Sequence, residues 1–181
     1  RAAQEVVDEG LAQPVLIGRP EVIAARIAKF GLRLRPGTDF ELVNINSDPR
    51  YRECSQLYYQ IMGRKGVSPE EAREAVLRKP SVIGTLLLRM GACDALVCGP
   101  VGKYEAHLRH VADVIGRSPA APVFAAMNGL LLPDRTLFVC DTYVNRNPSA
   151  EQLAGIARLA ADAVRRFGLE PKVALLSHSN F

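Results

Sequence analysis

The sequence predicts an α/β fold in which helices cover both faces of a mainly parallel sheet, giving three layers. Short apolar runs alternate along the chain with segments whose apolar residues recur at helical spacing. Glycine or proline separates most of these segments, where helices end or the chain turns. The 181 residues are 48% hydrophobic and 23% charged, a composition that allows a sizeable core.

The first part of the chain predicts an opening helix followed by two strand–helix pairs. Asp48 and Pro20 are residues that favour helix starts, and Gly10 is a helix stop. The expected helices are 1–9, 21–29 and 49–61, and the expected strands are 14–18 and 40–45.

A basic loop, residues 62–66, follows the third of these helices and contains Arg64 and Lys65. The loop is either a solvated corner or a cationic segment that faces a ligand cleft. Ser68 then predicts a new helix with an N-cap and an N1 proline. The apolar run 82–88 fits a buried strand or a buried helix, and its length favours the helix.

Residues 93–116 form the predicted centre of the fold. Residues 95–98 read as a buried parallel strand, Gly99 and Gly102 break the chain, and a helix begins at Tyr104 and stops at Gly116. Open α/β sheets bind ligands at such turns. With Lys103 in the turn and Arg109 on the helix, the segment would suit a phosphate-bearing ligand. An ordinary strand–helix connection remains the alternative.

After residue 117 the pattern changes, and we expect two subdomains, 1–117 and 118–181. Two apolar runs around residues 133–135 predict an antiparallel hairpin. A polar loop at 141–148, a helix capped by Ser149 that reaches Phe167, and a last strand at 173–176 complete the expected elements.

Three polar clusters follow predicted strands, at 99–104, 141–147 and 177–180. Strand ends converge at one edge of a doubly wound sheet, so the clusters could share a cleft. The last cluster could hydrogen-bond an acyl or phosphate group through Ser177, His178, Ser179 and Asn180. A capped loop with an exposed histidine is the alternative there, and Asp141 and Asn145 could instead cap their own loop. The pattern assigns no nucleophile.

Composition narrows the remaining possibilities. The net charge is only +4 and the basic residues are scattered, which speaks against nucleic-acid binding. No apolar run reaches the ~20 residues of a membrane span. The four cysteines have no metal-binding spacing, so a reduced cytoplasmic protein is expected. The start without Met and the end at a strand exit suggest a fragment.

Several strings resemble phosphate acetyltransferases (phosphotransacetylases), including PVLIG at 14–18, NRNPSAEQLA at 145–154 and EPKVALLSHSNF at 170–181. The resemblance covers the whole chain, which corresponds to somewhat more than the first half of that domain. It implies a two-domain α/β fold like that of isocitrate and isopropylmalate dehydrogenases, a dimer, and CoA bound between the domains.

Other strings resemble one branch, the phosphotransacetylase-like C-terminal domain of bacterial NADP-dependent malic enzymes: LYYQIMGRKG at 57–66, CGPVGKY at 98–104, AMNGLLLP at 126–133 and DTYVN at 141–145. This resemblance implies an N-terminal malic-enzyme region in cis, which uses NADP and a divalent metal to decarboxylate malate oxidatively. It also implies a homodimer or larger homo-oligomer, and acetyl-CoA as an inhibitory effector.

Departures from active phosphotransacetylases indicate lost catalysis. Met62 stands where the family pattern has an arginine, and Arg109 matches a second, vestigial one. The turn at 99–104 lacks the hydroxyl side chains of the corresponding turn in the family. The catalytic serine, arginine and aspartate of the family correspond to positions beyond Phe181. The resemblance therefore implies no catalytic residue and no metal in this domain, but a binding set for acetyl-CoA, CoA or phosphate: Arg64, Lys65, Gly99, Gly102, Lys103, Tyr104, Arg109, Asn145, Ser177, His178, Ser179 and Asn180. An active phosphate acetyltransferase and a module that only dimerises are the alternatives.

Overall fold

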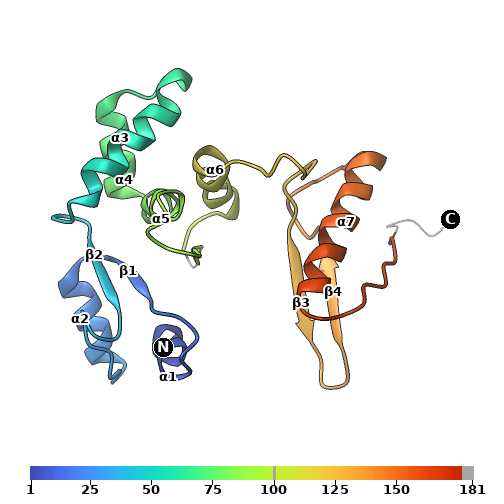
Figure 1. The fold of residues 1–181 in the computed structure, drawn as a ribbon, viewed down its shortest axis with the longest axis horizontal. Helices are drawn as coiled ribbons and strands as arrows, with labels where there is room; N and C mark the ends of the chain where they lie inside the picture. The colour runs from blue at the N-terminus through green and yellow to red at the C-terminus, as the bar shows by residue number, and fades with distance from the viewer. Residues whose placement is uncertain (100, 177–181) are drawn as a thin grey trace. The chain divides into compact units, whose positions relative to one another are not determined.

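A computed structural model describes residues 1–99 and 101–176 of the chain. The chain divides into two compact units, Arg1–Gly116 (unit 1) and Arg117–Phe181 (unit 2). Figure 1 shows their elements. None of the helices in the described part is both long and apolar enough to span a bilayer.

Unit 1 is mainly helical, with one small sheet. Its elements are α1 (Ala2–Asp8), β1 (Val15–Gly18), α2 (Pro20–Lys29), β2 (Glu41–Asn44), α3 (Arg50–Met62), the 3₁₀ helix η1 (Gly63–Lys65), α4 (Pro69–Arg78), α5 (Pro80–Arg89) and α6 (Tyr104–Val114). Strands β1 and β2 pair in parallel, with Val15 opposite Glu41 and Gly18 opposite Asn44. The strand–helix alternation predicted for residues 14–62 is therefore confirmed.

Helix α5 is the centre of the unit 1 core. Every residue from Ser81 to Leu87 is buried, and α5 packs against α3, α4 and α6. The helix, rather than the strand, is thus the correct choice for this apolar run. A helix closes its own backbone hydrogen bonds, so it can be surrounded by side chains on all sides.

The predicted buried strand at 95–98 is wrong. These residues form no strand in the described structure, and Val97 is 97% exposed. A parallel strand needs a neighbour to satisfy its backbone groups, and no described strand pairs with this run. Only Leu96 lies inward, where its Cδ1 methyl is 2.8 Å from the position that a Cβ on Gly84 would take.

The predicted last strand at 173–176 is wrong for the same reason. Its described residues pair with no strand, and Val173, Leu175 and Leu176 are 57%, 76% and 92% exposed.

Unit 2 contains β3 (Met127–Leu131), β4 (Thr136–Cys140) and α7 (Ala150–Arg166). The two strands pair antiparallel, which confirms the predicted hairpin. Helix α7 begins with a capping box between Ser149 and Gln152 and packs on β4, where the rings of Phe138 and Phe167 lie 5.6 Å apart. Among the described residues, the sheets are one parallel and one antiparallel pair, so the class is α/β, and the three-layer arrangement stays a prediction.

Candidate ligand-binding site

The basic loop at residues 62–66, here called the cationic loop, is joined to helix α6 of unit 1 by an ion pair. Lys65 Nζ, at the end of η1, lies 3.1 Å from Asp113 Oδ1 on α6. Two segments that are 48 residues apart in the chain are therefore neighbours. Arg64, beside Lys65, is exposed and makes no ion pair with any residue that the structure describes.

The glycine turn, which we define as Gly99 together with Val101, Gly102 and Lys103, leads directly into α6. Gly99 and Gly102 have φ angles of +113° and +103°, a region that favours glycine. Lys103 is the N-cap residue of α6 and is exposed. The predicted break between residues 98 and 104 is thus confirmed, although no strand precedes it.

His107 closes this turn, and the sequence analysis did not single it out. Its Nε2 lies 2.8 Å from the carbonyl oxygen of Val101. A Cβ on Gly102 would come within 3.1 Å of the same nitrogen, so Gly102 permits a close approach as well as an unusual φ.

Arg109 lies at the middle of α6 and is exposed. It forms no ion pair in the part of the chain that the structure covers. Arg64, Lys103 and Arg109 are therefore cationic side chains of unit 1 that form no ion pair with any described residue. Such charges are available to an anion.

Met62 does not face the solvent beside these cations. It is only 8% exposed and packs in the core of unit 1 with Tyr58 and Cys54, which lie one and two turns back on the same face of α3. The position where the resemblance implies an arginine is thus occupied by a thioether inside an apolar cluster.

His110 and Ser81 form a hydrogen bond between α6 and α5, with 2.7 Å between Nδ1 and Oγ. Burial, together with the charge of Lys79, lowers the pKa of His110, so the ring is neutral at neutral pH. A serine beside a histidine is also a nucleophile–base arrangement. Ser81 is only 5% exposed, however, so a substrate could not reach its hydroxyl.

Asn145, in unit 2, makes hydrogen bonds within its own loop. Its Nδ2 donates to the carbonyl of Phe124 and to Asp141 Oδ2, at 2.7 and 2.6 Å, and its backbone N–H donates to the same Asp141 oxygen at 2.7 Å. Although burial acts to raise it, these bonds and one from Ala126 N–H hold the pKa of Asp141 below its usual value. The loop-capping alternative is therefore what the structure shows for these two residues.

The remaining predicted ligand residues are Ser177, His178, Ser179 and Asn180, which lie outside the described residues. Tyr104, the first residue of α6, is 41% exposed.

In residues 1–99 and 101–176, no three His, Cys, Asp or Glu side chains come together as a metal site would require. All four cysteines are free thiols.

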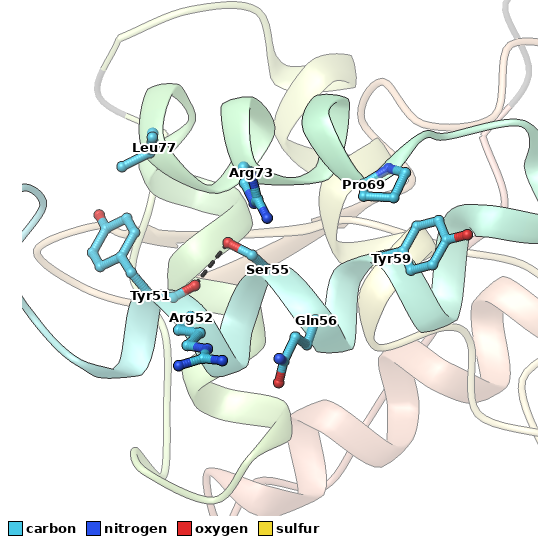
Figure 2. A pocket seen from close by; sticks show the side chains of 8 residues that line it. All are labelled: Tyr51, Arg52, Ser55, Gln56, Tyr59, Pro69, Arg73 and Leu77. Carbon is cyan, nitrogen blue, oxygen red and sulfur yellow. Dashed lines mark hydrogen bonds between the residues drawn. The ribbon is translucent and has the colours of Figure 1, made fainter.

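A groove between α3 and α4 is also present in unit 1, and Figure 2 shows its lining. Tyr51, Ser55 and Tyr59 line it from α3, and Ser55 Oγ donates to the carbonyl of Tyr51 at 2.7 Å. Arg73 and Leu77 close it from α4. None of the predicted ligand residues that the structure describes lines this groove.

Known proteins are similar to this chain along its whole length. The NADP-dependent malic enzyme of Escherichia coli K12 is 52% identical over 180 residues, which is 99% of this chain and 24% of that protein. The NAD-dependent malic enzyme of Rhizobium meliloti is 47% identical over 181 residues, 100% of this chain and 24% of the relative. The phosphate acetyltransferase of Nitratidesulfovibrio vulgaris is 32% identical over 179 residues, 99% and 25% of the two chains.

The chain spans about a quarter of the length of these relatives. Among solved structures, a phosphotransacetylase from Streptococcus pyogenes has the same fold, with a TM-score of 0.86 and 24% identity over 99% of this chain and 54% of that chain. The sequence model of the family described as phosphate acetyl/butaryl transferase matches residues 1–181. The chain belongs to the phosphate acetyl/butaryl transferase family, and within it resembles the region found in malic enzymes.

Proposed function

We propose that this chain is the phosphotransacetylase-like region of a malic enzyme and acts as an acetyl-CoA-binding regulatory domain without acetyl-transfer activity. The observation that carries the proposal is the burial of Met62 in the core, where active relatives are expected to have an arginine. Phosphoryl-bearing transition states depend on positioned cations, and removing one charge-stabilising donor typically costs about 10²- to 10³-fold in rate.

The residues that remain suit binding better than catalysis. Arg64, Lys103 and Arg109 are exposed cations in unit 1, and Lys103 stands at the start of α6. CoA carries several phosphate charges, which such side chains and a helix start attract. We propose that Gly99, Gly102, Tyr104 and Lys65 contribute to the same surface of unit 1. The ligand contacts expected of Ser177, His178, Ser179 and Asn180 remain predictions.

The malic-enzyme relatives support a proposal for the reaction of the whole protein and its regulation. A malic-enzyme region in cis would oxidise and decarboxylate malate with a divalent metal and NADP, with NAD as the other candidate because a relative of similar identity uses it. Acetyl-CoA would regulate this reaction by binding two states of a homodimer or larger homo-oligomer with different affinity. The proposed setting is the cytoplasm, where free thiols persist.

The test is the malate-dependent reduction of NADP by the intact protein, titrated with acetyl-CoA. The expected result is inhibition that saturates by about 1 mM, a typical range for a metabolite ligand. Arg109→Gln should shift the inhibition curve to higher acetyl-CoA concentration, because it removes a proposed phosphate contact. Arg73→Gln, which changes another exposed arginine, in the α3–α4 groove, is the matched control and should leave the curve in place. A rate of malate oxidation that stays unchanged at every acetyl-CoA concentration would contradict the proposal.

An active phosphate acetyltransferase is the second candidate, favoured by the match of the whole chain to that family. It would need Arg64 or Lys65 to replace the missing arginine, and Lys65 is already paired with Asp113. A module that only dimerises is the third candidate. Calorimetry separates it from the first, because a scaffold gives no heat with acetyl-CoA.

A further inference from the structure

Three polar side chains of α6 form a row along one side of the helix. His107, His110 and Asp113 are three residues apart, so they follow one another at about one turn. Each contacts a different segment of unit 1. His107 binds the glycine turn, His110 binds α5 through Ser81, and Asp113 binds η1 through Lys65.

The contact between His107 and the turn has a defined direction. A backbone carbonyl can only accept, so the Nε2 that lies 2.8 Å from Val101 O carries the hydrogen and donates it. The bond closes a ring of chain that contains Gly102, whose missing side chain leaves room for the imidazole. The imidazole and the glycine therefore both contribute to the shape of this turn.

The other ring nitrogen of His107 carries a cost to stability. His107 Nδ1 is buried and has no hydrogen-bond partner among the residues that the structure describes. A buried acceptor without a partner opposes folding, so an apolar side chain would avoid this penalty. What an apolar residue could not supply is the bond to Val101.

The rest of the row fixes α6 itself. Ser81 and Lys65 hold the helix at His110 and Asp113, and the guanidinium of Arg89 donates to the carbonyl of Val114. Helix α6 is thus attached both to the core helix α5 and to the cationic loop. A turn that is bonded to this helix has a fixed position relative to that loop.

We infer that His107 is a positioning residue, which holds the glycine turn against α6 so that Lys103 and Arg109 present their charges to a polyanionic ligand in one geometry. The inference rests on the proposed function, because acetyl-CoA is taken as the ligand. Pre-organised cations bind an anion more tightly than cations on a mobile turn, since less ordering is needed on binding.

The experiment is calorimetric titration of the intact protein with acetyl-CoA, with thermal unfolding measured in parallel. His107→Ala removes the donor and should weaken binding by about tenfold, the value expected when one hydrogen bond and its ordering effect are lost. His107→Gln keeps an N–H donor on a side chain of similar reach and should recover most of the affinity. Amide hydrogen exchange at residues 101–106 should become faster in His107→Ala and slower again in His107→Gln.

His110→Ala is the matched control, because it removes the same residue type one turn further along and breaks a bond to α5 instead of the turn. It should lower the melting temperature while it changes affinity by no more than about twofold. Wild-type affinity in His107→Ala would overturn the inference and leave the proposed function standing. So would equal losses in His107→Ala, His107→Gln and His110→Ala, which would indicate general destabilisation. Absence of binding by the wild-type protein would overturn both.

Discussion

Two apolar runs of unit 1, close together in the chain, have opposite environments. Residues 82–88 lie in α5 and are almost completely buried, with Leu86 at 0% exposure. Residues 95–98 are equally apolar in sequence, yet they form no regular structure, and Val97 is 97% exposed. Hydrophobicity alone therefore does not determine where a run is placed.

The difference lies in how each run satisfies its backbone. A helix makes its hydrogen bonds within itself, so α5 needs only side-chain neighbours, and α3, α4 and α6 supply them. A strand makes its hydrogen bonds to another strand, and the run at 95–98 has no such partner in the described structure. The apolar residues of a short run favour burial. Whether the run forms a strand depends on a pairing partner elsewhere in the chain.

The largest expected difference is in the alkylation rates of two cysteines, Cys54, which contacts Met90 just after the first run, and Cys98, which ends the second. Cys54 is fully buried and its sulfur lies 3.8 Å from that of Met90, directly after α5, whereas Cys98 is exposed at the end of the second run. Burial, with the nearby charge of Glu53, raises the pKa of Cys54 to about 11, and only the thiolate reacts readily. Cys98 should be alkylated at least about a thousandfold faster, since Cys54 must wait for unfolding.

Alkylation with iodoacetamide at neutral pH, followed by peptide mapping, measures both rates. Similar rates at the two cysteines would contradict the contrast between the runs. Because burial raises the pKa of the Cys54 thiol to about 11, a rise in pH to about 9 should not let Cys54 react within the folded protein, and its labelling should follow the unfolded fraction.

Leu86→Ala should give the next largest effect. It leaves a cavity in a fully buried site of α5, which typically costs about 2–5 kcal/mol in the free energy of unfolding. The control is Val97→Ala in the exposed run, which should cost no more than about 0.5 kcal/mol. Urea denaturation of both variants tests this. A large loss in Val97→Ala would mean that this run is packed in solution.

Gly84→Ala tests a place where the two runs meet, and its effect should be the smallest. The new methyl would lie 2.8 Å from Leu96 Cδ1 and 3.6 Å from Ile17 Cδ1. Overpacking costs about 1–3 kcal/mol, and the better helix propensity of alanine returns up to about 1 kcal/mol. The net loss of stability should be near 1 kcal/mol.

A double-mutant cycle isolates the contact behind that loss. In a Leu96→Ala background, Gly84→Ala should become neutral or stabilising, because the clashing methyl is gone. If Gly84→Ala costs the same in both backgrounds, Leu96 does not lie on α5 in solution.

The fold was predictable from the sequence where structure is local. Ser68 and Ser149 predict the starts of α4 and α7, and both make capping boxes. The turn residues 133–135 predict the hairpin of β3 and β4. The strands at 95–98 and 173–176 were mispredicted, because a strand depends on a partner that a local pattern does not contain.

The candidate site was predictable only in part. Lys103 and Arg109 follow from the sequence as exposed cations beside a glycine turn, and Met62 as a departure from the family. The role of His107 was missed because its bond to Val101 requires a turn geometry that residue types do not specify. The spacing of His107, His110 and Asp113, three residues apart on one predicted helix, was a visible signal of a polar row.

We propose that this domain keeps a ligand-binding surface and has lost acetyl transfer. The most direct test is acetyl phosphate formation by the intact protein from acetyl-CoA and inorganic phosphate, with an active phosphotransacetylase as the positive control. Because Met62 lies in the core where a phosphate-binding arginine is expected, we predict no phosphate-dependent release of CoA above the rate without protein. Turnover that saturates with both acetyl-CoA and phosphate would contradict the account.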